Sequence, residues 1–285
     1  MESIFEVIGL LVAFLLAIVT IAALIGGIVM ICYHFFSYSI DVFSFSLFGR
    51  DIYRYIDFFP ARLTISEESV LIRNFQYYKS LPSNLQDIFK NRLKKFADSK
   101  TFETRKGLLL TEEMKILVSA SAIQLTFGLR KYRLPDFKRI IIYPEQYYSL
   151  ITKKFHKGEA NAHGLIVLSW KDFKEGYIHS DDNLNLGLHE FAHALFISFL
   201  RDITEDMNFL SYYEEWRKIG DQEFFKLRKG ENKYLRSYGG TNLMEFFSVC
   251  IEHFFETPKE FNENIPRLYQ ILVKLLGQNP KKWIK

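Results

Sequence analysis

The stretch Leu188-His-Glu-Phe-Ala-His-Ala-Leu195 contains the pattern HExxH within an apolar helical periodicity. On a helix, residues four apart lie on one face, about 40° and about 6 Å apart, so the imidazoles of His189 and His193 can reach one metal ion. Zinc prefers such neutral nitrogen ligands, and a neighbouring carboxylate can take a proton from water. The pattern therefore predicts a catalytic zinc site with Glu190 as general base. The alternative is a pair of histidines on a polar helix face.

A catalytic zinc of this kind needs a third protein ligand. The metzincin class would require glycine at 196 and histidine at 199, where this chain has Phe196 and Phe199, so that class is excluded. A later apolar stretch contains Glu245 and Glu252, seven residues apart and nearly on one face of a helix. A buried charge in this stretch costs free energy unless it is paired or binds a metal. Either glutamate can therefore be the metal ligand, and the other can hydrogen-bond to a ligand. His253 is a third alternative, rotated by about 80° from Glu245.

The N-terminal region contains an uncharged apolar segment of 26 residues, from 7 to 32. As a helix it would be about 39 Å long, which exceeds the roughly 30 Å hydrocarbon core of a bilayer. Only acidic residues precede it and bulky aromatic residues follow it, unlike a cleaved signal peptide. We expect an uncleaved transmembrane anchor over 1–36 and a juxtamembrane tether over 37–80.

Charge indicates the orientation of this anchor and the class of partner. No Lys or Arg precedes the apolar segment, whereas Arg50, Arg54 and Arg62 follow it, which predicts a cytoplasmic C-terminal part. The net charge of +4 is too small for a nucleic-acid-binding surface, and the densest basic run, 90–95, reads as a solvated helix face. We therefore expect contact with a membrane and no nucleic-acid partner. The two cysteines lie far apart in apolar runs, which argues against a disulfide framework.

One folded domain is predicted over 81–285. Its expected helices begin with one opening at Ser83, the expected N-cap, and continue with 111–127, 184–201, 209–229, 241–256 and 261–276. Short apolar runs at 139–143 and 164–170 predict strands. The fold class is α+β, with a small sheet packed on the HExxH helix and a mostly helical C-terminal half. If 164–170 is a sheet edge, a peptide could pair with it.

Other polar residues have simpler interpretations. His156 and His163 are assigned to surface loops, and His179 to the turn before the HExxH helix. Asn185 either caps that helix or contacts the site, and the sequence leaves both open.

The chain also resembles the Mlc titration factor A (MtfA) family of zinc peptidases over roughly 75–275. The matching pieces are Tyr143-Pro144, Val167-Leu-Ser-Trp170, Asn185-Leu-Gly-Leu-His-Glu-Phe-Ala-His193, Tyr238, Glu245-Phe-Phe-Ser-Val249 and Phe254-Phe-Glu-Thr-Pro258. This resemblance implies a zincin-like fold, one zinc ion per chain and aminopeptidase-like activity in the cytoplasm. It implies His189, His193 and Glu245 as zinc ligands. It also implies Glu190 as general base and Tyr238 as the group that stabilises the oxyanion.

The predicted function is therefore a membrane-anchored zinc metallopeptidase that acts on peptide or protein substrates. The alternative is a membrane-tethered zincin-fold protein that binds a regulator and cleaves peptides weakly or incidentally. A purely structural zinc is disfavoured, because such sites normally close with four protein ligands.

Overall fold

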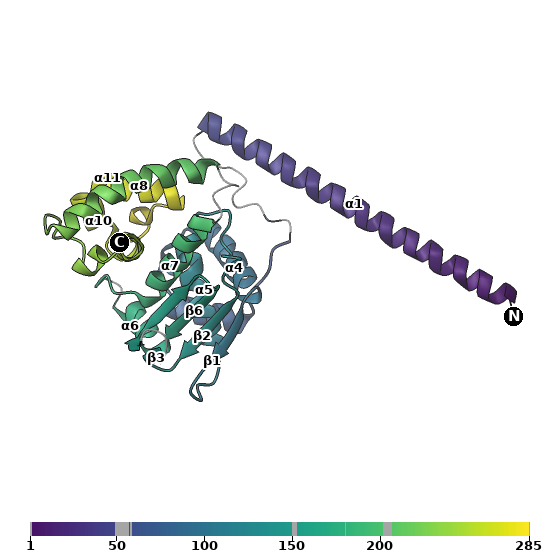
Figure 1. The fold of residues 1–285 in the computed structure, drawn as a ribbon, viewed down its shortest axis with the longest axis horizontal. Coiled ribbons are helices and arrows are strands. Elements are labelled where there is room, and N and C mark those ends of the chain that lie inside the picture. The colour runs from purple at the N-terminus through teal and green to yellow at the C-terminus, as the bar shows by residue number, and fades with distance from the viewer. Residues whose placement is uncertain are drawn as a thin grey trace. The chain divides into compact units, whose positions relative to one another are not determined.

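The computed structural model describes residues 2–48, 57, 59–149, 153–179, 181–201 and 207–284. It divides into two compact units, Met1–Phe58 and Phe59–Lys285. The described part of the first unit is largely one helix, α1 (Glu2–Phe48) (Figure 1). Its segment Phe5–Tyr33 is long and apolar enough to cross a membrane. Residues 2–36 of the predicted anchor thus lie within a helix that continues to Phe48, about three turns further.

The second unit begins before residue 81, so the structure differs from the predicted tether over 37–80. The helices α2 (Ile65–Asn74) and α3 (Gln76–Ser80) belong to this unit. Leu71 and Phe75 are completely buried in it, which would not be so in a tether. The two helices are short and meet at Phe75, so residues 65–80 carry no long helical periodicity. Residues 49–56 and 58 of the predicted tether lie outside the described residues.

A four-stranded sheet lies at the centre of the second unit, in the order β1-β2-β6-β5. The parallel strands are β1 (Thr101–Thr104), β2 (Arg139–Tyr143) and β6 (Leu165–Ser169). The two predicted strands are thus the central pair, in which Ile140 lies beside Ile166. Both residues are fully buried, as expected for apolar runs in a covered parallel sheet.

The edge of this sheet corrects one expectation. The outer strand is β5 (Gly158–Asn161), which pairs antiparallel with β6. Residues 164–170 therefore cannot offer a free edge to a peptide, because β2 and β5 flank them. A separate antiparallel pair is formed by β3 (Tyr147–Ser149) and β4 (Lys154–His156).

Helices pack around the sheet and form the C-terminal half (Figure 1). The HExxH helix, α7 (Leu186–Arg201), packs against β5, β6, α5 and α9. The other elements are α4 (Ser83–Asp98), α5 (Glu112–Thr126), α6 (Trp170–Ile178), α8 (Met207–Arg228), η2 (Ser237–Gly240), α9 (Leu243–Glu256), α10 (Pro258–Asn264), α11 (Pro266–Leu276) and η3 (Pro280–Lys282). The unit is a mixed α/β structure that is mostly helical.

Two helix boundaries differ from the sequence predictions. Pro82, without a side-chain cap, precedes α4, and Ser83 is its first helical residue instead of its N-cap. The predicted helix 261–276 is two helices, because Pro266 has no N–H to continue a helix and starts a new one. The predicted helix 111–127 is observed as α5, and its N-cap Thr111 accepts a hydrogen bond from the Met114 N–H.

Candidate metal centre

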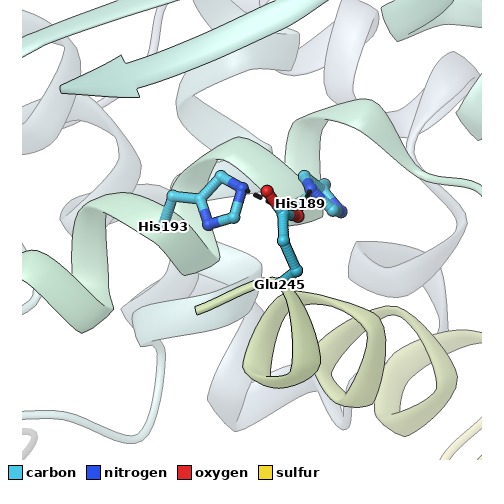
Figure 2. Close-up of side chains that lie close together, drawn as sticks. All are labelled: His189, His193 and Glu245. Carbon is cyan, nitrogen blue, oxygen red and sulfur yellow. Dashed lines mark hydrogen bonds and ion pairs between the residues drawn. The ribbon is translucent and has the colours of Figure 1, made fainter. Parts of the chain in front are cut away.

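Two imidazoles and one carboxylate converge between α7 and α9. Their possible ligand atoms all lie within 4.8 Å of one another. Glu245 Oε2 lies 3.0 Å from His189 Nε2 and 3.4 Å from His193 Nε2. Figure 2 shows the Glu245 side chain rising from α9 between the two rings of α7. The structure thus brings together the two motif histidines and the first of the two candidate carboxylates.

The local structure of α9 explains where Glu245 lies. The Asn242 side chain accepts hydrogen bonds from the N–H groups of Met244 and Glu245, so the helix begins just before the carboxylate. The fully buried Phe246 and Phe247 follow at once and fix this turn in the core. Glu245 is therefore held in the first turn of α9, where that turn faces α7.

The donor set fits a divalent cation of the zinc type. Two nitrogens and one oxygen at about 2.0–2.1 Å from a tetrahedral zinc would stand about 3.4 Å apart. The two measured separations from Glu245 Oε2, 3.0 and 3.4 Å, are close to that spacing. Three protein ligands also leave one tetrahedral position for water or substrate, which is the arrangement of a catalytic site.

Hydrogen bonds at the other ring nitrogens orient both histidines. His193 Nδ1 lies 3.0 Å from the Ser248 hydroxyl, and His189 Nδ1 lies 3.2 Å from Glu252 Oε2. Such partners direct Nε2 toward a metal and increase the basicity of the ring. Glu252 also accepts from the Arg236 guanidinium and, at 3.0 Å, from the Asn185 N–H. Glu252 is thus a supporting residue and Glu245 the one in the ligand cluster.

The charged groups of this cluster shift one another's pKa values. Burial lowers the pKa of His189, but hydrogen bonds to Glu245 and Glu252 outweigh burial and raise that pKa to about 10. Burial raises the pKa of Glu245, but bonds to His189 and His193 outweigh it and hold that pKa below its usual range. Burial keeps the pKa of His193 below its usual range. The carboxylates therefore attract positive charge to the point where the ligand atoms meet.

Glu190 is almost completely buried, with 4% of its surface exposed. Within the part of the chain that the structure describes, its Oε2 has no hydrogen-bond partner. Burial raises the pKa of Glu190 to about 8, with the nearby charge of His189 acting in the opposite direction. The edge strand β5 runs close by: a Cβ added to Gly158 would lie 2.5 Å from Glu190 Oε1. A glycine at this position is what leaves room for the carboxylate.

Tyr238 lies at the mouth of the site, in η2. Its ring centroid is 6.0 Å from that of His189, and half of the side chain is exposed. Burial of the hydroxyl, with the charge of Glu245, raises the pKa of Tyr238 to about 12, so the phenol keeps its proton at neutral pH. Tyr238, Glu190 and Gly158 line one cleft of about 570 Å³. The catalytic role assigned to Tyr238 stays a prediction.

The other polar residues considered in the sequence lie outside the ligand cluster. His253 is buried with its ring 4.8 Å from Tyr234, and it does not belong to the ligand cluster. His156 is part of β4 instead of a loop, and it lines the cleft together with His179. Asn185 fulfils both alternatives, because Oδ1 accepts from the Leu188 N–H while its own N–H binds Glu252.

Three residues of the site, Ser248, Arg236 and Gly158, are not predicted from the sequence. Ser248 carried a usable signal, since it stands one helical turn after Glu245 and four residues before Glu252. Arg236 and Gly158 carried none, because a loop and an edge strand bring them to the site only in the folded chain.

Comparisons with known proteins identify the family of this chain. Residues 59–276 match the family described as glucose-regulated metallo-peptidase M90. An uncharacterized protein of Synechocystis sp. is 25% identical over 230 residues, covering 75% of this chain and 84% of that protein. Mlc titration factor A of Edwardsiella ictaluri and that of Pectobacterium atrosepticum are each 26% identical over 200 residues, covering 62% of this chain and 73% of theirs. The resemblance found in the sequence is confirmed: this chain belongs to the M90 metallo-peptidase family, which includes Mlc titration factor A.

Proposed function

We propose that this chain is a membrane-anchored zinc metallopeptidase with a zincin-like fold that hydrolyses peptide bonds. The observation that carries the proposal is the convergence of His189, His193 and Glu245 beside the buried carboxylate of Glu190. Membership of a metallopeptidase family supports the same conclusion. The zincin-like assignment is supported by the HExxH helix packed on a mixed sheet, with the third ligand on a later helix.

The residues of the site divide the chemistry between them. A zinc ion held by His189, His193 and Glu245 would act as a Lewis acid on the peptide carbonyl and make water more acidic. Glu190 accepts the proton of the attacking water and delivers it to the leaving amine. Its Oε2 is free of other hydrogen bonds and is thus available for this exchange. The Tyr238 hydroxyl donates to the carbonyl oxygen as negative charge develops on it.

The edge strand β5 would hold the substrate in an extended conformation. Among the described strands, β5 pairs only with β6, so its outer edge can form backbone hydrogen bonds with a peptide. Gly158 on this strand contacts Glu190, so a peptide added here would pass the general base. Aminopeptidase-like cleavage is part of the proposal. The cleft also contains Glu175 and Asp182, whose carboxylates can attract a free α-amino group.

The proposed location is a membrane, with the catalytic unit on the cytoplasmic side. The segment Phe5–Tyr33 supports the anchor by its length and composition. The orientation is supported by three arginines that follow the apolar segment, Arg50, Arg54 and Arg62. Arg50 and Arg54 lie outside the described residues. The partners proposed are peptide or protein substrates and the membrane, without nucleic acid.

A direct test uses the full chain purified in detergent. We expect about one zinc per chain by elemental analysis, and cleavage of members of a peptide library by mass spectrometry. Glu190→Gln should keep the zinc and lose cleavage, because it removes the base and leaves the three ligands. Cleavage by Glu190→Gln at the wild-type rate would refute the mechanism. Zinc binding by a wild-type chain that cleaves no peptide would favour the regulator-binding alternative.

A further inference from the structure

A second cavity, of about 740 Å³, lies among α3, α6, the end of α9 and the C-terminal residues Trp283 and Ile284. None of the proposed zinc ligands lines it, and neither does Glu190. Its volume is in the range of pockets that bind small organic molecules. The cavity is therefore distinct from the cleft over the metal centre.

Four side chains that line this cavity have a buried polar atom without a hydrogen-bond partner among the described residues. The atoms are Gln124 Oε1, the Tyr177 hydroxyl, Glu256 Oε2 and Trp283 Nε1. Gln124 itself is 5% exposed. The Tyr177 hydroxyl lies near the side chains of Ser121 and Asn185, and the Glu256 carboxylate lies near the Asn183 N–H. A buried polar atom that is left unpaired destabilises the fold. Gln124 Oε1, Glu256 Oε2 and the Tyr177 hydroxyl can accept a hydrogen bond, whereas Trp283 Nε1 only donates one. Three acceptors around one cavity indicate a place where a bound molecule with N–H groups supplies the missing partners.

The charge of the cavity indicates the sign of that molecule. Glu256 Oε1 accepts from Asn185 Nδ2 at 3.1 Å, but no Lys or Arg among the described residues forms an ion pair with this carboxylate. Burial raises the pKa of Glu256 to about 8, and the negative charge of Glu252 adds to the effect. Asp181 also lines the cavity, while the Lys79 ammonium binds the Arg73 carbonyl at 3.4 Å. The cavity thus presents two carboxyl groups, Glu256 and Asp181, and Glu256 has no ion-pair partner among the described residues.

The walls supply an apolar and aromatic surface. The rings of Tyr77 and Phe255 meet edge to face at 5.8 Å, and Trp283 adds a third aromatic side chain. Aromatic faces attract organic cations as well as apolar groups. We infer that this cavity binds a small organic cation, with its ammonium or guanidinium group at Glu256 and its apolar part against Tyr77 and Phe255.

Calorimetric titration with phenethylammonium tests this inference on the zinc-loaded full chain in detergent, with empty micelles as the blank. The neutral analogue 2-phenylethanol has the same ring and chain length without the charge. We expect one phenethylammonium per chain and binding of 2-phenylethanol at least about tenfold weaker, because a hydrogen bond to a charged group contributes about 1.5–3 kcal/mol. Glu256→Gln keeps the shape of the side chain and should lower the affinity for phenethylammonium by a similar factor.

Two further variants locate the bound amine. Glu190→Gln should leave its affinity unchanged, whereas Trp283→Ala should weaken it by removing one aromatic wall. Circular dichroism and zinc content establish that each variant is folded. The inference is overturned if the wild type does not bind phenethylammonium or binds the alcohol as tightly. It is also overturned if folded Glu256→Gln or Trp283→Ala binds normally, or if Glu190→Gln abolishes binding and so places the amine in the catalytic cleft.

Discussion

Replacing Gly158 by alanine should impair catalysis without removing the metal. The new Cβ would lie 2.5 Å from Glu190 Oε1 and 2.6 Å from its Cγ, whereas ordinary contacts begin at 3.4 Å. Glu190 or strand β5 must therefore move by about 1 Å, and a misplacement of that size can lower the rate about a hundredfold. The backbone of Gly158 is not in the left-handed region, so the effect is steric.

The assay is kcat/KM on a peptide that the wild type cleaves, measured together with zinc content. We expect a loss of about 10²-fold with normal zinc, since the three ligands come from α7 and α9. Gly240→Ala is the matched control, because its Cβ meets nothing closer than 3.5 Å. Turnover by zinc-loaded Gly158→Ala at the wild-type rate would refute the reasoning. Loss of zinc would show that the substitution disturbs more than the base.

The remaining predictions concern ligands, oxyanion, orientation and pH. Alanine at His189, His193 or Glu245 should abolish tight zinc binding. Glu252→Ala should weaken zinc binding about 10–100-fold. One bound zinc per chain in Glu245→Ala would show that Glu245 is not the ligand. Tyr238→Phe should keep zinc and lower kcat at least tenfold, and wild-type turnover would exclude that role. Added protease should digest the second unit in sealed inverted vesicles, and protection there would reverse the orientation. Burial lowers the pKa of His253 from 6.5 to about 4. Its contribution to the free energy of unfolding is therefore fully present above pH 6.5, and that free energy falls by up to about 3 kcal/mol as the pH drops toward 4. His253→Phe should lose this part of the pH dependence in denaturant titrations, and an unchanged profile would contradict it.

The sequence predicted those parts of the fold that have strong periodicity. Residues 139–143 are β2 as predicted, and the HExxH helix was predicted to within two residues, because continuous apolar runs and 3.6-residue spacing are unambiguous there. Strand β5 was missed because Gly-Glu-Ala-Asn has neither alternation nor β-branched residues. That strand exists through its pairing with β6, which a local pattern does not contain.

The third ligand shows a different limit of sequence reasoning. Glu245 and Glu252 are two turns apart on nearly the same face of α9, so periodicity alone treated them as equivalent. The packing of α9 on α7 separates them, because Glu245 reaches His189 Nε2 whereas Glu252 reaches Nδ1 of the same ring. Which nitrogen each carboxylate meets depends on the position of one helix along another, and sequence spacing does not give that position.

Glu252 shows why the orientation of the histidine is a property of the whole unit. Its carboxylate accepts hydrogen bonds from Arg236, which precedes η2, and from the Asn185 N–H at the start of α7. The same carboxylate lies beside His189 Nδ1. A carboxylate that is 2% exposed would be strongly destabilising without such partners. The same contacts that offset its burial fix the His189 ring and direct Nε2 toward Glu245. Stability and ligand geometry therefore depend on one buried charge, and the start of α7, the residue before η2 and α9 must all be in place for either.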